Sequence, residues 1–187
     1  MRIVGGRLRG RALNSPASRA VRPTSERLRE SIFDILAHAY GDPVAGARVI
    51  DLFAGSGALG IEALSRGAAF ALFVEASAAA RALIRTNIDA LALAATARIW
   101  RADATKLGKA PAQYSLAFLD PPYDESLAEP ALRALVSGGW LAEGALCVVE
   151  GNAGAIIEPP VPLRLVEERV YGDTKIAILL LETSREQ

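Results

Sequence analysis

The sequence has few of the side chains that build disulfides or metal centres. Its 187 residues include one cysteine and one histidine. A lone Cys147 excludes an internal disulfide framework, and one His with one Cys disfavours a zinc site. No apolar run approaches the roughly 20 residues of a membrane span. The basic N-terminus also lacks the apolar stretch of a secretory signal. These absences predict a soluble, cytoplasmic protein.

The chain also lacks a net charge, but its charges are unevenly spread. Residues 1–30 carry eight arginines against two glutamates, a net charge of +6, so the remainder carries −6. A cationic end indicates a polyanionic partner, most often nucleic acid. On charge alone, a solvated basic tail is the alternative. Half of the residues are apolar, which is enough for the core of one domain.

The hydrophobic pattern predicts a short N-terminal extension followed by alternating strands and helices. Arginines and apolar residues alternate over residues 2–13 around Gly5-Gly6, which favours a short hairpin, and a loop follows at 14–18. A helix is predicted at 22–40, with one apolar face formed by Leu28, Ile32, Ile35, Leu36 and Ala39. Further helices are predicted at 57–66, 77–93 and 125–136, and strands at 48–52, 70–75, 97–101, 115–119, 145–150, 163–170 and 175–181.

This alternation indicates a parallel sheet that is covered on both faces. The short link "YGDT" means that the last two strands must be antiparallel, since a parallel crossover needs a dozen residues or more. Open sheets of this kind bind ligands outside the carboxyl ends of their strands.

Polar residues follow three of these strands in turn. In "DLFAGSGALG", residues 51–60, Gly55 and Gly57 allow a tight turn, and the helix that follows points free N–H groups at the same place. Glu75 ends the next strand and can accept hydrogen bonds from both hydroxyls of a ribose. Asp103 follows the third strand, where a carboxylate beside a backbone N–H can read the edge of an adenine.

The glycines and Glu75 also match the dinucleotide fingerprint, so a nicotinamide dehydrogenase is a rival interpretation. Asp51 argues against it, because it would repel a pyrophosphate but attract the ammonium of an amino acid. No second domain remains for a hydride substrate. A nucleoside that carries an amino acid, S-adenosylmethionine, fits better. If the glycines served only the turn and the packing of the helix, the positions of Asp51 and Glu75 would remain unexplained.

The stretch "LAFLDPPYD", residues 116–124, supplies the chemistry of an amine methyltransferase. The Asp120 carboxylate and the Pro121 carbonyl can accept hydrogen bonds from an exocyclic amine and so free its lone pair. Pro121 and Pro122 fix this geometry at little entropic cost. Tyr123 offers a flat face for stacking an extruded base.

The sequence resembles the RsmD family of bacterial small-subunit ribosomal RNA guanine-N2 methyltransferases. The match runs through "RIVGGRLRGRAL", "RPTSERLRESIFDIL", "DLFAGSGALGIEALSRGA", "FVE", "DPPY" and "YGDTKIAIL". Many amino-methyltransferases share the middle motifs, whereas the first two are specific to the family. The resemblance implies an α/β, Rossmann-like class I methyltransferase fold: a mostly parallel seven-stranded sheet with an antiparallel last pair, plus an N-terminal β-hairpin and helix.

The resemblance also implies adenosylmethionine as donor and one guanine of 16S rRNA as target, in an assembling or assembled 30S subunit. We expect a monomer with no metal and no membrane partner, organised as an Arg-rich extension at 1–20 and a methyltransferase domain at 21–187. The predicted catalytic residues are Asp120, Pro121, Pro122 and Tyr123. The predicted cofactor residues are Asp51, Phe53, Ala54, Gly55, Gly57, Glu75, Ala76, Asp103 and Ala104. The predicted RNA-binding residues are Arg7, Arg9, Arg11, Arg22, Thr24 and Arg27.

Three alternatives remain at this point. A DNA adenine or cytosine amino-methyltransferase uses the same logic, but 187 residues leave little room for a target-recognition region. A non-catalytic RNA-binding assembly factor could keep the fold, although the intact "DPPY" argues against it. A C5-pyrimidine methyltransferase needs a cysteine nucleophile, and Cys147 sits in mid-strand.

Overall fold

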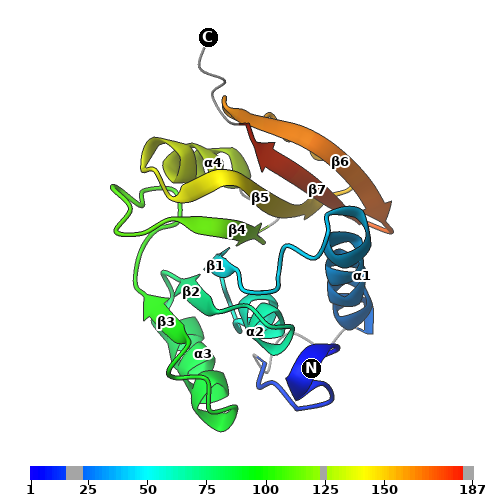
Figure 1. The fold of residues 1–187 in the computed structure, drawn as a ribbon, viewed down its shortest axis with the longest axis vertical. Coiled ribbons are helices and arrows are strands. Elements are labelled where there is room, and N and C mark those ends of the chain that lie inside the picture. The colour runs from blue at the N-terminus through cyan, green and yellow to red at the C-terminus, as the bar shows by residue number, and fades with distance from the viewer. Residues whose placement is uncertain (16–22, 123–125, 183–187) are drawn as a thin grey trace.

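The computed structural model describes residues 1–15, 23–122 and 126–182, which form a twisted sheet flanked by helices (Figure 1). The sheet has seven strands in the order β3-β2-β1-β4-β5-β7-β6. The first five are parallel, and β7 lies antiparallel between β5 and β6. The predicted mostly parallel sheet with an antiparallel last pair is confirmed. The strands are β1 (Arg48–Leu52), β2 (Phe70–Val74), β3 (Ala97–Trp100), β4 (Tyr114–Leu119), β5 (Leu141–Asn152), β6 (Leu163–Tyr171) and β7 (Thr174–Leu181).

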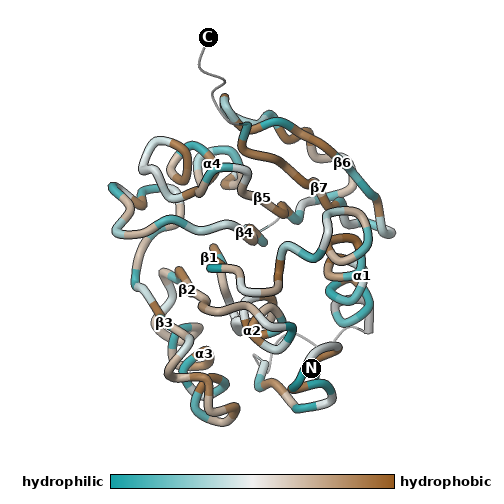
Figure 2. The backbone as a smooth tube through the Cα atoms, viewed as in Figure 1, coloured by the Kyte–Doolittle hydropathy of each residue, from teal (hydrophilic) through white to brown (hydrophobic). Residues whose placement is uncertain are grey.

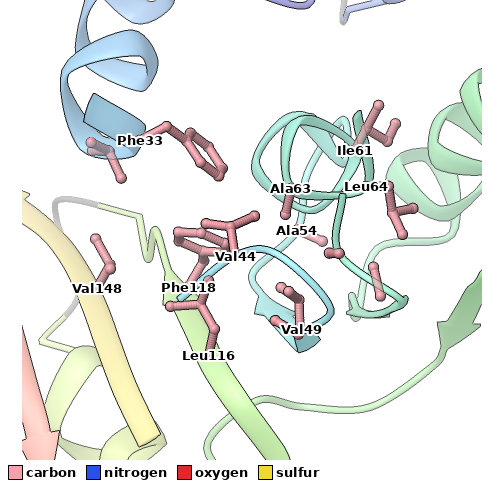
Figure 3. Close-up of a cluster of buried hydrophobic side chains, with 14 of the residues drawn as sticks. Phe33, Val44, Val49, Ala54, Ile61, Ala63, Leu64, Leu116, Phe118 and Val148 are labelled. Carbon is pink, nitrogen blue, oxygen red and sulfur yellow. The ribbon is translucent and has the colours of Figure 1, made fainter. Parts of the chain in front are cut away.

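Helices cover both faces of the sheet and close two apolar cores. On one face, α1 (Pro23–Ala39), α2 (Ala58–Ser65) and α3 (Ala78–Ala90) share a core, in which the rings of Phe33 and Phe118 lie 5.4 Å apart (Figure 3). On the other face, α4 (Ala128–Ser137) packs over a second core that includes Trp140. Figure 2 shows β7, which lies between β5 and the edge strand β6, as a largely hydrophobic strand. Among the described helices, none is long and apolar enough to cross a membrane.

Two element boundaries differ from the prediction for local reasons. Helix α3 ends at Ala90 rather than at residue 93, because Ala92 has a φ of 55°, a left-handed conformation that stops a helix. Strand β5 begins at Leu141, four residues earlier than predicted. Its pairing with β4 shifts register between Tyr114 and Leu116, and Gly144 has a φ of 70°. The glycine looks like a turn in the sequence but marks an irregularity within the strand.

The N-terminal segment, residues 1–15, folds back on itself and packs on α2 and α3. Its two arms pair antiparallel at Arg2 and Ala12, as the hairpin prediction requires, but the turn contains a 3-10 helix, η1 (Gly6–Leu8). A Cβ at Gly6 would lie 2.0 Å from the Ser65 carbonyl oxygen, so this glycine permits close backbone contact with α2. The buried Ile3, Leu8 and Leu13 join the core of α1–α3. The predicted boundary at residue 20 lies outside the described residues.

Candidate active site

The predicted site residues converge where the chain order of the sheet reverses. Strand β1 lies between β2 and β4, so the loops that follow β1 and β4 flank a topological switch point. Open α/β sheets bind their ligands at this place. The charges of Asp120 and Glu75 both act on the Asp51 carboxyl, so carboxylates from β1, β2 and β4 lie close together at this edge.

The loop after β1 turns through a series of left-handed residues. Phe53, Gly55 and Gly57 have φ angles of 57°, 58° and 79°, and Gly57 caps the N-terminus of α2. A positive φ is strained in Phe53, because it is a bulky residue, and strained residues of this kind are frequent at ligand sites. A Cβ at Gly60 would lie 2.4 Å from the ring of Phe73, so this glycine is required for packing of α2 on β2.

Three side chains hold this glycine loop from different elements. Asp51 Oδ2 accepts a hydrogen bond from the Gly60 amide at 2.9 Å, and Glu75 Oε2 accepts one from the Gly55 amide at 2.9 Å. Asn87 of α3 donates from Nδ2 to the Ser56 carbonyl at 3.0 Å. Asn87 was not among the predicted residues, because a mid-helix asparagine gives no sequence signal of a contact 31 residues away.

Asp51 is a buried acid in an environment that favours a cation. Its exposed fraction is 1%, and this burial raises the pKa of its carboxyl well above the ordinary value. The Gly60 hydrogen bond lowers that pKa, whereas the charges of Asp120 and Glu75 raise it further. A positively charged ligand at this edge would stabilise the ionised form of Asp51.

The turns after β2 and β3 present two further carboxylates. Glu75 Oε1 accepts a hydrogen bond from the Ser77 amide at 2.7 Å, and Arg81 donates to the carbonyls of Glu75 and Ala76. Asp103 Oδ1 accepts hydrogen bonds from the hydroxyl and amide of Thr105, which lower the pKa of Asp103. The predicted Ala54 and Ala104 are buried beside these turns, and Ala76 is exposed.

The end of β4 borders a pocket of about 240 Å³. Pro121 and Pro122 line it together with Glu150 and Asn152 of β5. Asp120 and Glu150 directly follow the paired residues Leu119 and Val149, so Asp120, just past the end of β4, lies beside Glu150 of the neighbouring parallel strand β5. Sequence reasoning missed Glu150, although its place at the end of a predicted strand was a usable signal. Tyr123 lies outside the described residues.

The surroundings of Cys147 do not suit a nucleophile. The thiol is buried in β5, and burial raises its pKa to about 12. The reactive thiolate is therefore suppressed near neutral pH. This disfavours C5-pyrimidine methylation and confirms the interpretation of Cys147 as a small core residue. Within the described ranges, no three His, Cys, Asp or Glu side chains are grouped closely enough to hold a metal ion.

The predicted RNA-binding arginines that the structure describes are on the surface. Arg7, Arg9, Arg11 and Arg27 are exposed. Arg29, which contributes to the N-terminal charge, is instead 4% exposed and lies 3.4 Å from the carboxylate of Glu62. The positive charge of Arg29 is therefore paired inside the fold and does not contribute to the N-terminal surface. Arg22 and the side chain of Thr24 lie outside the described part of the chain.

Comparison with known proteins establishes the family to which this chain belongs. Residues 1–180 match the protein family described as Conserved hypothetical protein 95. The chain is 37% identical over 188 residues to Ribosomal RNA small subunit methyltransferase D of Escherichia coli K12, which covers all of this chain and 92% of that relative. The chain belongs to the RsmD family.

Solved structures agree with the family assignment. The structure of yhhF from Escherichia coli is similar, with a TM-score of 0.83 and 35% identity over 97% of this chain and 98% of that one. The Thermus thermophilus 16S rRNA N2 G1207 methyltransferase RsmC, solved with AdoMet and guanosine, gives a TM-score of 0.66 at 21% identity. It covers 89% of this chain and 45% of that one, a likeness of fold. The predicted RsmD family, methyltransferase class and Rossmann-like fold are confirmed.

We expect Glu75→Ala to weaken adenosylmethionine binding by at least about tenfold. The substitution removes the acceptor predicted for the ribose and also the hydrogen bond to the Gly55 amide. Charged hydrogen bonds contribute roughly 1.5–3 kcal/mol each, which supports a loss of this size. Titration calorimetry measures the change, and Glu75→Gln, which keeps one acceptor oxygen, should lose less. Unchanged affinity in Glu75→Ala would remove Glu75 from the cofactor site, and tight binding of NAD would revive the dinucleotide interpretation.

Proposed function

We propose that this RsmD-family protein transfers a methyl group from S-adenosylmethionine to the exocyclic N2 amine of a guanine in 16S rRNA. The observation that carries the proposal is the position of Asp120-Pro121-Pro122. These residues directly follow β4 at the switch point, beside a glycine loop that Asp51 of β1 and Glu75, which follows β2, hold in place. Methylation of small-subunit ribosomal RNA is the activity in the name of the Escherichia coli relative.

The residues at the strand ends fit adenosylmethionine, which supplies an activated methyl group on a positively charged sulfur. Gly55 and Gly57 bring backbone close to the ligand, and Glu75 accepts from the ribose hydroxyls. Asp103, with its lowered pKa, stays ionised to accept from the adenine amine beside the amide of Ala104. The buried Asp51 carboxyl favours the positive charge of the methionine part. Phe53, Ala54 and Ala76 complete the lining of the proposed adenosylmethionine site.

In this proposal, residues after β4 orient the target amine. The lone pair of a guanine N2 amine is delocalised into the ring, and acceptors on its two hydrogens make it available for attack. Asp120 and the Pro121 carbonyl serve as these acceptors, and Pro121 has no N–H to compete. The two prolines hold both groups in one geometry, so proximity supplies much of the rate. Tyr123 is the proposed stacking face for the base.

Glu150 favours guanine over the bases of the DNA alternative. Guanine presents two adjacent donors, N1–H and the N2 amine, whereas the same edges of adenine and cytosine pair an amine with an acceptor nitrogen. Glu150 of β5 lines the Pro121-Pro122 pocket, and Asp120 directly precedes Pro121 at the end of the neighbouring β4. Carboxylates accept from donors and repel acceptor nitrogens, so this pair selects guanine.

The decisive experiment supplies radiolabelled adenosylmethionine with naked 16S rRNA, 30S particles or duplex DNA, followed by nucleoside analysis. We expect N2-methylguanosine from at least one of the RNA substrates. Labelled N6-methyladenine or N4-methylcytosine from DNA would instead establish the DNA amino-methyltransferase. Binding of RNA with no transfer to any substrate would indicate a non-catalytic assembly factor.

We expect the double substitution Arg7→Gln/Arg9→Gln to weaken RNA binding and reduce its salt dependence. Both side chains are exposed, so we expect the buried Ile3 and Leu8 to keep their packing. Each lost phosphate contact should reduce the slope of log affinity against log salt by roughly 0.7–0.9. Filter binding at several salt concentrations measures the slope. Cofactor affinity should stay the same.

The exposed Arg133 of α4 provides a matched control for this arginine pair. Arg133→Gln removes a surface charge on the opposite face of the sheet and should leave the RNA slope unchanged. An equal decrease in slope per charge removed in Arg7→Gln/Arg9→Gln and in Arg133→Gln would mean that overall charge, and not the N-terminal segment, attracts the RNA.

A further inference from the structure

Asn87 of α3 is a buried polar residue whose side chain is fully hydrogen-bonded. Its exposed fraction is 1%. Oδ1 accepts hydrogen bonds from the backbone amide and the side-chain amide of Asn14, at 2.8 and 3.0 Å. Nδ2 donates to the carbonyls of Asn14 and Ser56, at 3.1 and 3.0 Å. Every donor of the side chain and both acceptor positions of its oxygen are therefore used.

This set of partners requires an asparagine. The two donors around Oδ1 and the two carbonyls around Nδ2 fix the orientation of the amide. A flipped amide would place its N–H groups against the donors and its oxygen against the carbonyls. Aspartate would keep the acceptor but would turn a second oxygen toward two carbonyls. Alanine would leave polar groups of Ser56 and Asn14, which are partly buried at these contacts, without these partners.

The partners of Asn87 belong to two regions of different function in the proposed mechanism. Ser56 lies between Gly55 and Gly57 in the cofactor loop. Asn14 ends the last arm of the N-terminal segment, which carries the exposed Arg7, Arg9 and Arg11. Helix α2, which begins at the end of the cofactor loop, also contacts this segment: the Leu8 amide donates to Ser65 Oγ at 3.0 Å. The segment is thus docked on the two helices behind the cofactor loop.

We infer that Asn87 is a positioning residue that holds the cofactor loop and couples it to the N-terminal segment. The coupling rests on the proposed function, since it assumes that the segment binds RNA. A shift of the loop on adenosylmethionine binding would reach Asn14 through the Ser56–Asn87 and Asn87–Asn14 hydrogen bonds. By thermodynamic reciprocity, RNA bound to the segment strengthens cofactor binding by the same factor. Typical couplings between sites are about fivefold or greater.

The test measures two affinities in the full-length protein. The first is the affinity for S-adenosylhomocysteine without RNA. The second is the affinity for a transcript of 16S rRNA with and without S-adenosylhomocysteine, and its ratio gives the coupling. In the wild type we expect a ratio of about five or more. Asn87→Asp should bind S-adenosylhomocysteine about tenfold more weakly, because Ser56 loses its donor, and its ratio should fall toward one.

Matched variants separate positioning from general destabilisation. Asn14→Ala removes one hydrogen bond to Asn87 but retains the Ser56 contact, so S-adenosylhomocysteine affinity should change less than about twofold. Thr86→Ala alters the neighbouring exposed position of α3, where the hydroxyl bonds only its own helix at Ala82, and should leave both measurements unchanged. Thermal melting verifies that each variant is folded at the assay temperature.

Wild-type S-adenosylhomocysteine affinity in Asn87→Asp would overturn the positioning role. A wild-type ratio of one, with RNA still bound, would overturn the coupling. If the wild type binds no RNA, the proposed function and the coupling fail together, while the S-adenosylhomocysteine affinities still decide whether Asn87 positions the loop.

Discussion

Replacing Asp120 with alanine is expected to lower the rate of methyl transfer by about 10²–10³, the usual cost of losing one preorganised polar partner of a transition state. Adenosylmethionine affinity should stay close to that of the wild type, because Asp120 acts on the target amine. The loss of its negative charge also relieves the repulsion that Asp120 exerts on the buried Asp51 carboxyl. Single-turnover methyl transfer to the RNA that serves as substrate measures the rate, and calorimetry measures the cofactor affinity.

Asp120→Asn provides the matched control. Its amide oxygen can accept one hydrogen bond from the amine, so its rate should lie between those of the wild type and Asp120→Ala. A near wild-type rate in Asp120→Ala would refute the amine-orienting role. A loss confined to cofactor affinity would reassign Asp120 to the cofactor site.

Replacing Glu62 with alanine is expected to lower the free energy of unfolding by about 3–5 kcal/mol, the range for removing one partner of a buried ion pair. Glu62 is 0% exposed and accepts hydrogen bonds from the amides of Val4 and Gly5. It also pairs with Arg66 at 2.9 Å and with the buried Arg29 at 3.4 Å. Burial already lowers the pKa of Arg29, and loss of Glu62 would leave this guanidinium without its nearest counter-charge.

Urea denaturation measures this loss, and two further variants test its cause. Glu129→Ala breaks the exposed pair with Arg133 and should cost at most about 1 kcal/mol. Glu62→Leu combined with Arg29→Met removes both buried charges and should recover part of the stability, because neither group is then left unpaired. Equal losses for Glu62→Ala and Glu129→Ala would show that burial does not set the strength of the Glu62 network.

The elements that local pattern specifies were predictable from the sequence. Alternating apolar runs located all seven strands, and the glycines around Ser56 marked the loop after β1. The carboxylates at residues 75, 103 and 120 could be placed because parallel strands end at a common edge. The two-residue link between Tyr171 and Thr174 fixed the antiparallel last pair.

Contacts between distant parts of the chain were not predictable in the same way. Glu62 and Asn87 look like ordinary helix residues, and their roles depend on amides 57 to 73 positions away. Gly5 and Gly6 suggested a hairpin turn, but they permit close packing on the end of α2. Glu150 belongs to the site because of the sheet order, which places β5 beside β4. Such roles follow from tertiary packing, which local propensity does not encode.

The docking of the N-terminal segment has a consequence for how the chain folds during synthesis. Residues 1–15 leave the ribosome before their partners Glu62, Ser65 and Asn87, which follow dozens of residues later. Until then, Ile3, Leu8 and Leu13 have no core to enter. Because synthesis proceeds at about 5–20 residues per second, these apolar side chains wait several seconds in solvent. Charged residues that flank an apolar stretch reduce aggregation, so we expect the same arginines that are proposed to bind RNA to limit aggregation of this segment before it folds.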